Sequence, residues 1–238
     1  KTPIELGSGF LNFYSSGDNR LINTNNLKSK IVNDVSYENY DIYTKNGFRN
    51  NLNAYLKNIN RVSKKDAKYK SNTQIELATI FEGMTSFPMM KINKITTDYL
   101  IPKISLRFNP SDMSDNSSSN NNISIDNIFN INRLGVSDTY EGGKSLTIGI
   151  DYKKESIQDI NKYFQLKLGT VFRDVEEDRI SPSSTINRKG SNLFGSIDSN
   201  FTDFFNLEYN FAIDNNLNSF EHNNIKSTFL LKNITTEF

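Results

Sequence analysis

Apolar and polar residues alternate along most of this chain with a period of two. In residues 204–214, Phe205, Leu207, Tyr209 and Phe211 take every second position, and mostly polar residues stand between them. Successive side chains of a β-strand point to opposite faces, so this spacing predicts a strand with one apolar and one polar face. Helical periodicity is nearly absent. The chain is therefore predicted to be all-β.

The same alternation recurs in nine further segments, which are residues 4–14, 28–44, 48–59, 70–82, 92–108, 143–153, 162–173, 190–201 and 225–238. Within residues 92–108 the apolar set that contains Tyr99 and Ile101 is expected to continue after Pro102 as Ile104, Leu106 and Phe108. Together the segments predict an antiparallel meander of about ten amphipathic strands.

The connections between these segments alternate between long and short. Long polar connections are expected at residues 16–27, 60–69, 109–139, 175–189 and 215–224, and short ones at 45–47, 83–90, 154–161 and 202–204. Long loops at one rim and short turns at the other are typical of transmembrane β-barrels. A soluble β-sandwich or solenoid is the alternative, but nothing in a sandwich requires one end to hold all the long loops. The pattern favours an arc of a large outer-membrane β-barrel, with 109–139 as a long extracellular loop.

A barrel of this kind places the apolar face of each strand against membrane lipid and the polar face toward a water-filled lumen. The backbone groups must then pair between strands, because hydrocarbon offers them no water. In residues 143–153 the lumen side is expected to carry Thr147, Gly149 and Asp151. The residues expected to face lipid are Leu146, Ile148, Ile150, Phe164, Leu166, Leu168, Phe205, Leu207, Tyr209 and Phe211.

Composition agrees with strands that are apolar on one face only. Hydrophobic residues make up 36% of the 238 residues, below the roughly 45–50% of ordinary globular domains. Aromatic residues nevertheless reach 12%, whereas a disordered chain would be poor in them. The 28 basic and 27 acidic residues nearly cancel, so no field of one sign points to a nucleic-acid partner.

Candidate chemistry is sparse. The single histidine, His222, stands in a polar segment with no catalytic partners nearby in the sequence, and the absence of cysteine excludes a disulfide or a cysteine metal site within these residues. Carboxylates cluster at Asp174, Glu176, Glu177 and Asp178; their oxygens suit a divalent cation, but the spacing is not that of an EF-hand, so an exposed loop is the simpler interpretation. No catalytic, cofactor or metal site is predicted.

One segment carries a resemblance to a known family. The stretch NIFNINRLGVSDTYEGGKSLTIGIDY, residues 127–152, resembles part of the lipopolysaccharide-assembly outer-membrane protein family LptD. The family pattern has an Asn-Arg pair, a Gly two residues later, an Asp three further, and an acidic-Gly-Gly group before a strand. The matching positions are Asn132, Arg133, Gly135, Asp138, Glu141, Gly142 and Gly143. Flanking strand-like segments are similar to further elements of the same barrel.

The resemblance implies a function in the outer membrane of a Gram-negative bacterium. Proteins of this family form a very large barrel with a plug lipoprotein, LptE. They receive lipopolysaccharide from a periplasmic bridge through an N-terminal domain and release it to the outer leaflet through a lateral opening between the first and last strands. The family's N-terminal domain and disulfide cysteines are not found here, so the chain is expected to be a middle section of the barrel. The resemblance implies no enzymatic activity.

Two interpretations of residues 132–143 remain open. In the first, the loop folds into the lumen, where it seals the barrel or contacts saccharide, with Arg133 on a phosphate. In the second, the glycines permit tight turns while Arg133 and Asp138 pair within the loop. Other functions also remain open. A porin, with charged lumen residues around one inward-folded loop, a ligand-gated receptor and a soluble carbohydrate-binding β-protein are the alternatives.

Overall fold

The computed structural model describes residues 3–22, 26–65, 71–120, 122–136, 139–200, 202–231 and 234–237. They form one antiparallel sheet of 14 strands in the order β1-β2-β3-β5-β6-β8-β9-β10-β11-β12-β13-β14, with β4 paired to β5 and β7 to β8. The strands are β1 Ile4–Leu6, β2 Gly9–Ile22, β3 Asn26–Asn39, β4 Ile42–Tyr43, β5 Arg49–Lys64, β6 Gln74–Ser86, β7 Met89–Ile92, β8 Thr96–Asn109, β9 Gly143–Ser156, β10 Tyr163–Arg173, β11 Leu193–Ser199, β12 Phe205–Ile213, β13 Phe220–Leu231 and β14 Ile234–Glu237. A 3-10 turn lies at Pro182–Ser184.

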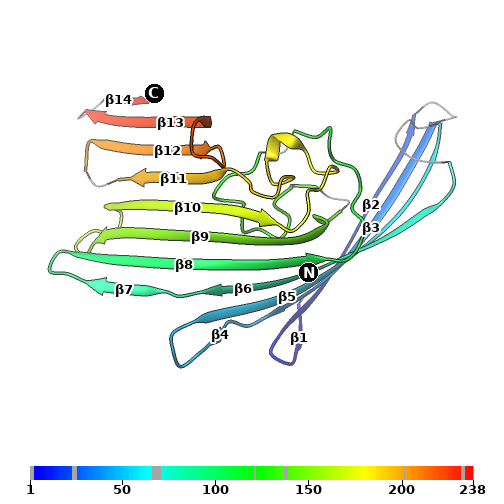
Figure 1. Cartoon of the computed structure of the whole chain (residues 1–238), viewed down its shortest axis with the longest axis horizontal. Helices are drawn as coiled ribbons and strands as arrows, with labels where there is room; N and C mark the ends of the chain where they lie inside the picture. The colour runs from blue at the N-terminus through cyan, green and yellow to red at the C-terminus, as the bar shows by residue number, and fades with distance from the viewer. Residues whose placement is uncertain are drawn as a thin grey trace.

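The predicted meander is confirmed. Each longer strand pairs with the next longer strand along the chain, and every pairing is antiparallel. The sheet is strongly curved, with β2, β3 and β5 crossing away from the nearly parallel rows of β8–β13, and it stays open between its first and last strands (Figure 1). This shape is an arc of a barrel. Among the described residues no helix has the length and apolar character needed to cross a membrane.

Two of the expected long connections are wrong. Residues 16–27 are mostly strand, because β2 and β3 stay paired from Gly9↔Asn39 to Ile22↔Asn26. Residues 215–224 also shorten to a turn, since β13 begins at Phe220. Both segments are mostly polar and their few apolar residues do not alternate regularly, which hides a strand from an analysis of apolar alternation. Backbone pairing satisfies the main-chain hydrogen bonds whatever the side chains are. The long connections at 109–139 and 175–189 are present, as residues 110–142 and 174–192.

The register places the expected apolar positions on one common side of the sheet. Leu146 lies opposite Leu106 on β8 and opposite Phe172 on β10. Leu106 is 61% exposed and Phe172 45%, whereas Thr147 next along β9 is fully buried. We call the side with Leu106 and Leu146 the outer face and the side with Thr147 the inner face. The expectation that one apolar set continues through Pro102 is wrong: β8 and β9 pair without a break, so Tyr99 and Ile101 belong to the inner face and Leu106 to the outer face.

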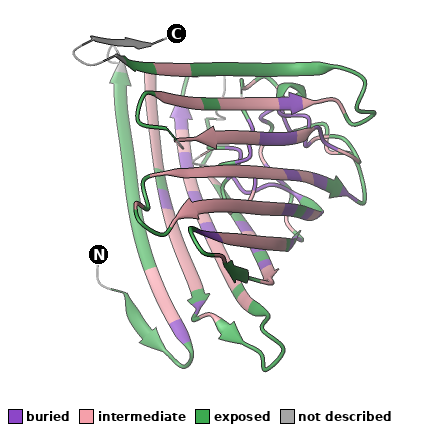
Figure 2. Ribbon diagram, turned by 90° about the vertical axis from the view of Figure 1, so that its left-hand side faces the viewer, coloured by how far each residue is buried: buried purple, intermediate pink, exposed green. Residues whose placement is uncertain are grey.

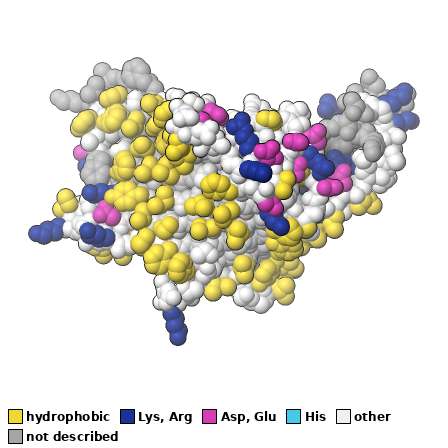
Figure 3. All heavy atoms as spheres, viewed as in Figure 1, with side chains coloured by type: hydrophobic (Ala, Val, Ile, Leu, Met, Phe, Trp, Pro, Cys, Tyr) yellow, Lys and Arg dark blue, Asp and Glu magenta, His cyan; other side chains and the backbone are white. Residues whose placement is uncertain are grey.

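The outer face is apolar over several neighbouring strands. Across β10, β11 and β12 the row Leu166, Ile197 and Tyr209 lies in register, as does the row Leu168, Gly195 and Phe211. Apolar side chains gather in a broad patch over β8–β13, and charged side chains stand mainly toward its borders (Figure 3). Leu146, Ile148, Ile150, Phe164, Leu166, Leu168, Phe205, Leu207, Tyr209 and Phe211 all belong to strands of this patch.

The inner face is covered where the two long loops meet it. Residues 110–142 and 174–192, which we call the plug, share one hydrophobic core with the inner face. Its buried members are Met113, Ile123, Ile125, Ile128, Leu134, Val171, Ile180, Ile186, Phe194 and Ala212. Buried residues concentrate at these loops and the strand ends beneath them (Figure 2). The expectation of a water-filled lumen against all of the polar face is therefore wrong at β8–β10, where Ser105 and Thr147 are completely buried.

Candidate functional site: a buried ion-pair cluster beneath the plug

The plug is fastened to the sheet by a buried arginine and glutamate. Arg133 donates from Nε to Glu141 Oε2 at 2.6 Å and from Nη2 to Glu141 Oε1 at 2.5 Å. Its Nη1 donates to Ile128 O and Thr147 Oγ1, and its Nη2 also donates to Ser145 Oγ at 3.0 Å. These contacts use all five guanidinium donors. Because the Arg133 side chain is 0% exposed and its donors are all used, none is left for a phosphate. Arg133 is instead paired within the loop, as in the second interpretation but with Glu141 as the partner.

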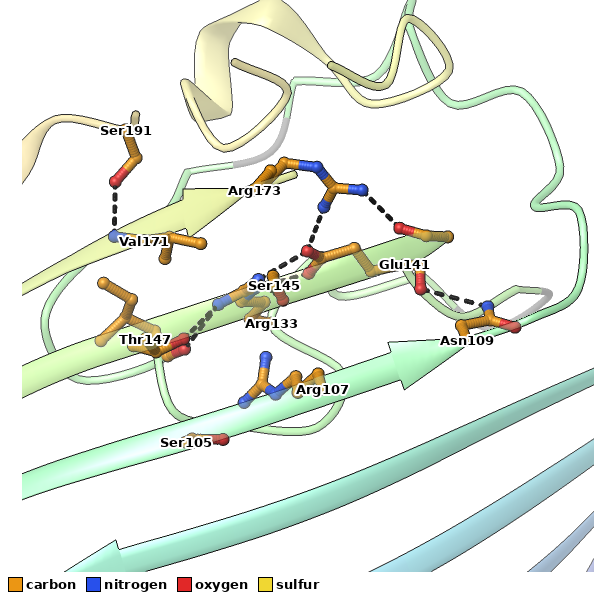
Figure 4. A network of polar contacts seen from close by, with 12 residues as sticks. Ser105, Arg107, Asn109, Arg133, Glu141, Ser145, Thr147, Val171, Arg173 and Ser191 are labelled. Atoms are coloured by element: carbon orange, nitrogen blue, oxygen red, sulfur yellow. Dashed lines mark hydrogen bonds and ion pairs between the residues drawn. The ribbon is translucent and has the colours of Figure 1, made fainter. Parts of the chain in front are cut away.

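A second arginine reaches the same carboxylate from the sheet. Arg173 is the last residue of β10, and it donates from Nη1 to Glu141 Oε1 and from Nη2 to the carbonyl of Gly142. Asn109, the last residue of β8, donates to the carbonyl of Glu141 at 3.1 Å. The ends of β8 and β10 thus hold the point where the plug returns to β9 (Figure 4).

A third arginine completes the cluster. Arg107 of β8 donates from Nε to Glu82 Oε1 of β6 at 3.0 Å, and Ser105 donates to the same oxygen. The Nη1 and Nη2 atoms of Arg107 are buried and have no hydrogen-bond partner in the described parts of the chain. The cluster therefore holds three guanidinium groups against the carboxylates of Glu82 and Glu141. A buried group of this kind specifies one geometry and is costly to break.

The charge on Glu141 makes the attachment of the plug dependent on pH. Burial alone would raise the pKa of its carboxyl, but Arg133, and then Arg173 and Arg107, outweigh burial and lower the pKa from 4.5 to about 2. A pKa that is lower in the folded state stabilises the fold above the unfolded value, and this contribution is lost as the pH falls toward the folded value. We expect the thermal midpoint of plug unfolding, followed by near-ultraviolet circular dichroism, to be level from pH 7 to about pH 5 and to fall below about pH 4.5.

The Glu141→Gln variant is the control for this pH profile. It has no carboxyl to titrate, so its midpoint should start lower and lack the step attributed to Glu141. An identical acid step in both proteins would assign that step to other carboxylates.

Two glycines are needed for the plug to enter and cover the sheet. Gly143 begins β9 at φ +77°, a backbone conformation that other residues adopt with strain. A Cβ on Gly149 would lie 2.7 Å from the Phe129 ring and 2.9 Å from the carbonyl of Leu168. Glycine within a strand commonly marks such a close approach. Gly149 was expected to face the lumen, and it instead forms the floor on which the plug rests.

The other motif residues shape the loop itself. The Asn132 side chain donates to Val136 O at 2.8 Å, and the amide of Gly135 donates to Asn132 O at 3.0 Å, which closes a turn. The buried amide of Gly142 donates to Met113 Sδ at 3.4 Å. Asp138 lies outside the described residues.

Sequence patterns missed Glu82, Arg107 and Arg173. Their positions were the signal that could have identified them. Each is a charged residue on the inner face, and the two arginines stand at or near the last residue of a strand that precedes a long loop. The resemblance drew attention only to the loop side of the cluster. His222 and the four carboxylates at residues 174–178 do not join it, and among the described residues no group of three or more His, Cys, Asp or Glu side chains is placed to hold a metal ion.

A hollow lies against the outer face, across β5, β6, β8, β9 and β10. It measures about 750 Å3, and Leu52, Phe81, Leu106, Leu146 and Phe172 line it. Arg107 and Arg173 belong to strands that form the floor of this hollow. Their side chains lie on the opposite side of the sheet, where they are buried under the plug. An almost wholly apolar wall suits hydrocarbon chains better than a polar substrate.

A curved antiparallel sheet with an apolar outer face, and with loops packed into its inner side, defines the class of β-barrel arcs. A comparison with protein-family models is more specific: the model of LPS transport system D, LptD, matches residues 30–235. The chain belongs to this family, whose role is the transport of lipopolysaccharide. A search of the curated proteins finds no match.

Proposed function

We propose that the chain forms part of the outer-membrane translocon that assembles lipopolysaccharide into the outer leaflet. The observation that carries the proposal is the LptD family match over residues 30–235. The apolar outer face supports it, because a barrel in lipid needs an apolar band on its outer side. In this proposal, the outer-face residues of β9, β10 and β12 contact lipid, and the plug lies at the extracellular rim.

The family suggests the partners of the complete protein. They are lipopolysaccharide as cargo, an LptE-like lipoprotein inside the barrel, and a periplasmic Lpt bridge that delivers the lipid through an N-terminal domain. We infer that the plug, residues 110–142 and 174–192, closes part of the lumen so that the translocon does not leak. The buried cluster at Glu141 would hold it closed.

Depletion of the full-length protein in its native cell tests this function. We expect newly made lipopolysaccharide to stop reaching the cell surface and to accumulate inside the outer membrane, as measured by labelling of surface-exposed saccharide. Re-expression of the wild-type gene should restore delivery. Normal delivery during depletion would disprove the assignment.

A porin is a second candidate, because an inward-folded loop also narrows porin channels. Here the loop residues nearest the sheet form a hydrophobic core, and Arg133 and Glu141 are paired and buried rather than open to solvent. That arrangement suits a seal better than a charged constriction. Conductance of the intact protein in a planar bilayer separates the two: a steady, ion-selective open channel would favour the porin.

A further inference from the structure

A small cavity separates the plug from the inner face of β2, β3 and β5, beside the buried cluster, and its wall residues Asn132 and Tyr140 directly precede Arg133 and Glu141. It measures about 230 Å3, and its walls include Tyr14 of β2, Asp34 of β3, Tyr55 and Lys57 of β5, and Asn132 and Tyr140 of the plug. We propose that this cavity binds one neutral sugar ring of the lipopolysaccharide saccharide. The proposal rests on the proposed function, since it names the part of the cargo that this site would contact.

Aromatic side chains supply the apolar walls. The Tyr55 and Tyr140 rings lie 6.3 Å apart between centroids at an interplanar angle of 57°, and Tyr14 on the neighbouring wall is 51% exposed. A sugar ring has apolar C–H faces and polar hydroxyls around its edge. Tyrosine matches both properties, because its ring is apolar and its hydroxyl donates and accepts hydrogen bonds.

Polar groups beside the rings supply hydrogen bonds without net charge. Lys57 Nζ lies 2.6 Å from Asp34 Oδ1, and it also stands 5.1 Å from the centre of the Tyr140 ring. Tyr55 and Tyr140 both line the cavity, and a tyrosine hydroxyl can donate and accept a hydrogen bond. Because Lys57 and Asp34 neutralise each other, these walls favour hydroxyl groups over a phosphate.

The size of the cavity limits the ligand to one ring. Sites for drug-sized molecules take roughly 300–1,000 Å3, so 230 Å3 is too small for several sugars or for an acylated lipid. Burial, together with Asp34, raises the pKa of Tyr140 to about 12. Its hydroxyl therefore stays protonated and able to donate at physiological pH.

The test measures oligosaccharide binding to the intact protein in detergent. The probe is the lipid-free oligosaccharide released by mild acid from the lipopolysaccharide of the same cells, followed by saturation-transfer NMR and titration. We expect Tyr14→Ala to weaken binding about tenfold, and Tyr55→Phe, which removes only a hydroxyl, to weaken it several-fold. Phe13→Ala is the matched control, because Phe13 is 62% exposed and its side chain points to the opposite face of the same strand.

Each outcome decides the proposal. Weaker binding in the two tyrosine variants with unchanged binding in Phe13→Ala supports the site. No binding by the wild-type protein, or equal binding by all variants, overturns it. Loss of lipopolysaccharide delivery on depletion would still support the translocon in that case, so the failure of the sugar site and the failure of the proposed function are separate results.

Discussion

Replacement of Glu141 by glutamine should open the plug. The substitution keeps the shape of the side chain but removes the charge that faces the buried guanidinium groups of Arg133 and Arg173. Loss of one partner from a buried ion pair costs about 3–5 kcal/mol, because the remaining charge stays buried without compensation. Hydrogen exchange of the amides in residues 110–142 should therefore show that the free energy of local opening is lower than in the wild-type protein by about that amount.

Asp126→Asn is the matched control for this prediction. Asp126 belongs to the same loop and pairs with Lys167 of β10 at 2.9 Å, but its side chain is 61% exposed. An exposed pair contributes about 0–1 kcal/mol, so this variant should exchange almost as slowly as the wild-type protein. Equal effects of Glu141→Gln and Asp126→Asn would show that the buried cluster does not hold the plug.

The same pair of variants tests the proposed seal in cells. If the plug closes the lumen, Glu141→Gln in the full-length protein should admit large antibiotics that the outer membrane normally excludes, and Asp126→Asn should not. Normal exclusion by a variant whose loop is shown to be open would contradict the seal. Lipopolysaccharide delivery measured in parallel would distinguish a leak from a loss of transport.

The strand faces were predictable from sequence because the two-residue period is a local property. Leu146, Ile148 and Ile150 lie on one face whatever the neighbouring strand is. Regular register also divides the apolar set that was expected to continue through Pro102, since no bulge interrupts the pairing of β8 with β9 to bring Ile101 and Leu106 onto one face. Mostly polar strand segments without regular apolar alternation, such as the far ends of β2 and β3, lacked the signal altogether.

The plug was not predictable in the same way, because its contacts join residues far apart in the chain. Arg133 and Arg173 meet at one carboxylate only after the loop of residues 110–142 folds onto the inner face beside the end of β10. Gly149 gave a hint, since a glycine inside a regular strand leaves room for another group. The identity of that group, Phe129, depends on the path of the loop.

Replacement of Leu207 by arginine tests the other half of the proposed function, the contact with lipid. Leu207 lies on β12 opposite Ser199 of β11 and Ser227 of β13, on the face that also carries Phe205 and Tyr209. An arginine on the lipid face of a barrel costs about 2–4 kcal/mol at the middle of the bilayer and less near its edges. We expect urea unfolding of the intact protein in phospholipid vesicles to show a loss of stability within that range.

Glu208→Arg is the control, because Glu208 is the next residue of the same strand and faces the inner side. It lies opposite Asp198 of β11 and Lys226 of β13, and an arginine there stays in a polar setting. Glu208→Arg reverses a charge, whereas Leu207→Arg only adds one, yet Glu208→Arg should change the stability of the protein very little. The contrast between the two variants therefore depends on the face of the sheet and not on charge itself. If arginine were tolerated equally at both positions, the outer face would not lie against lipid, and the apolar surface of β8–β13 would require a protein partner instead.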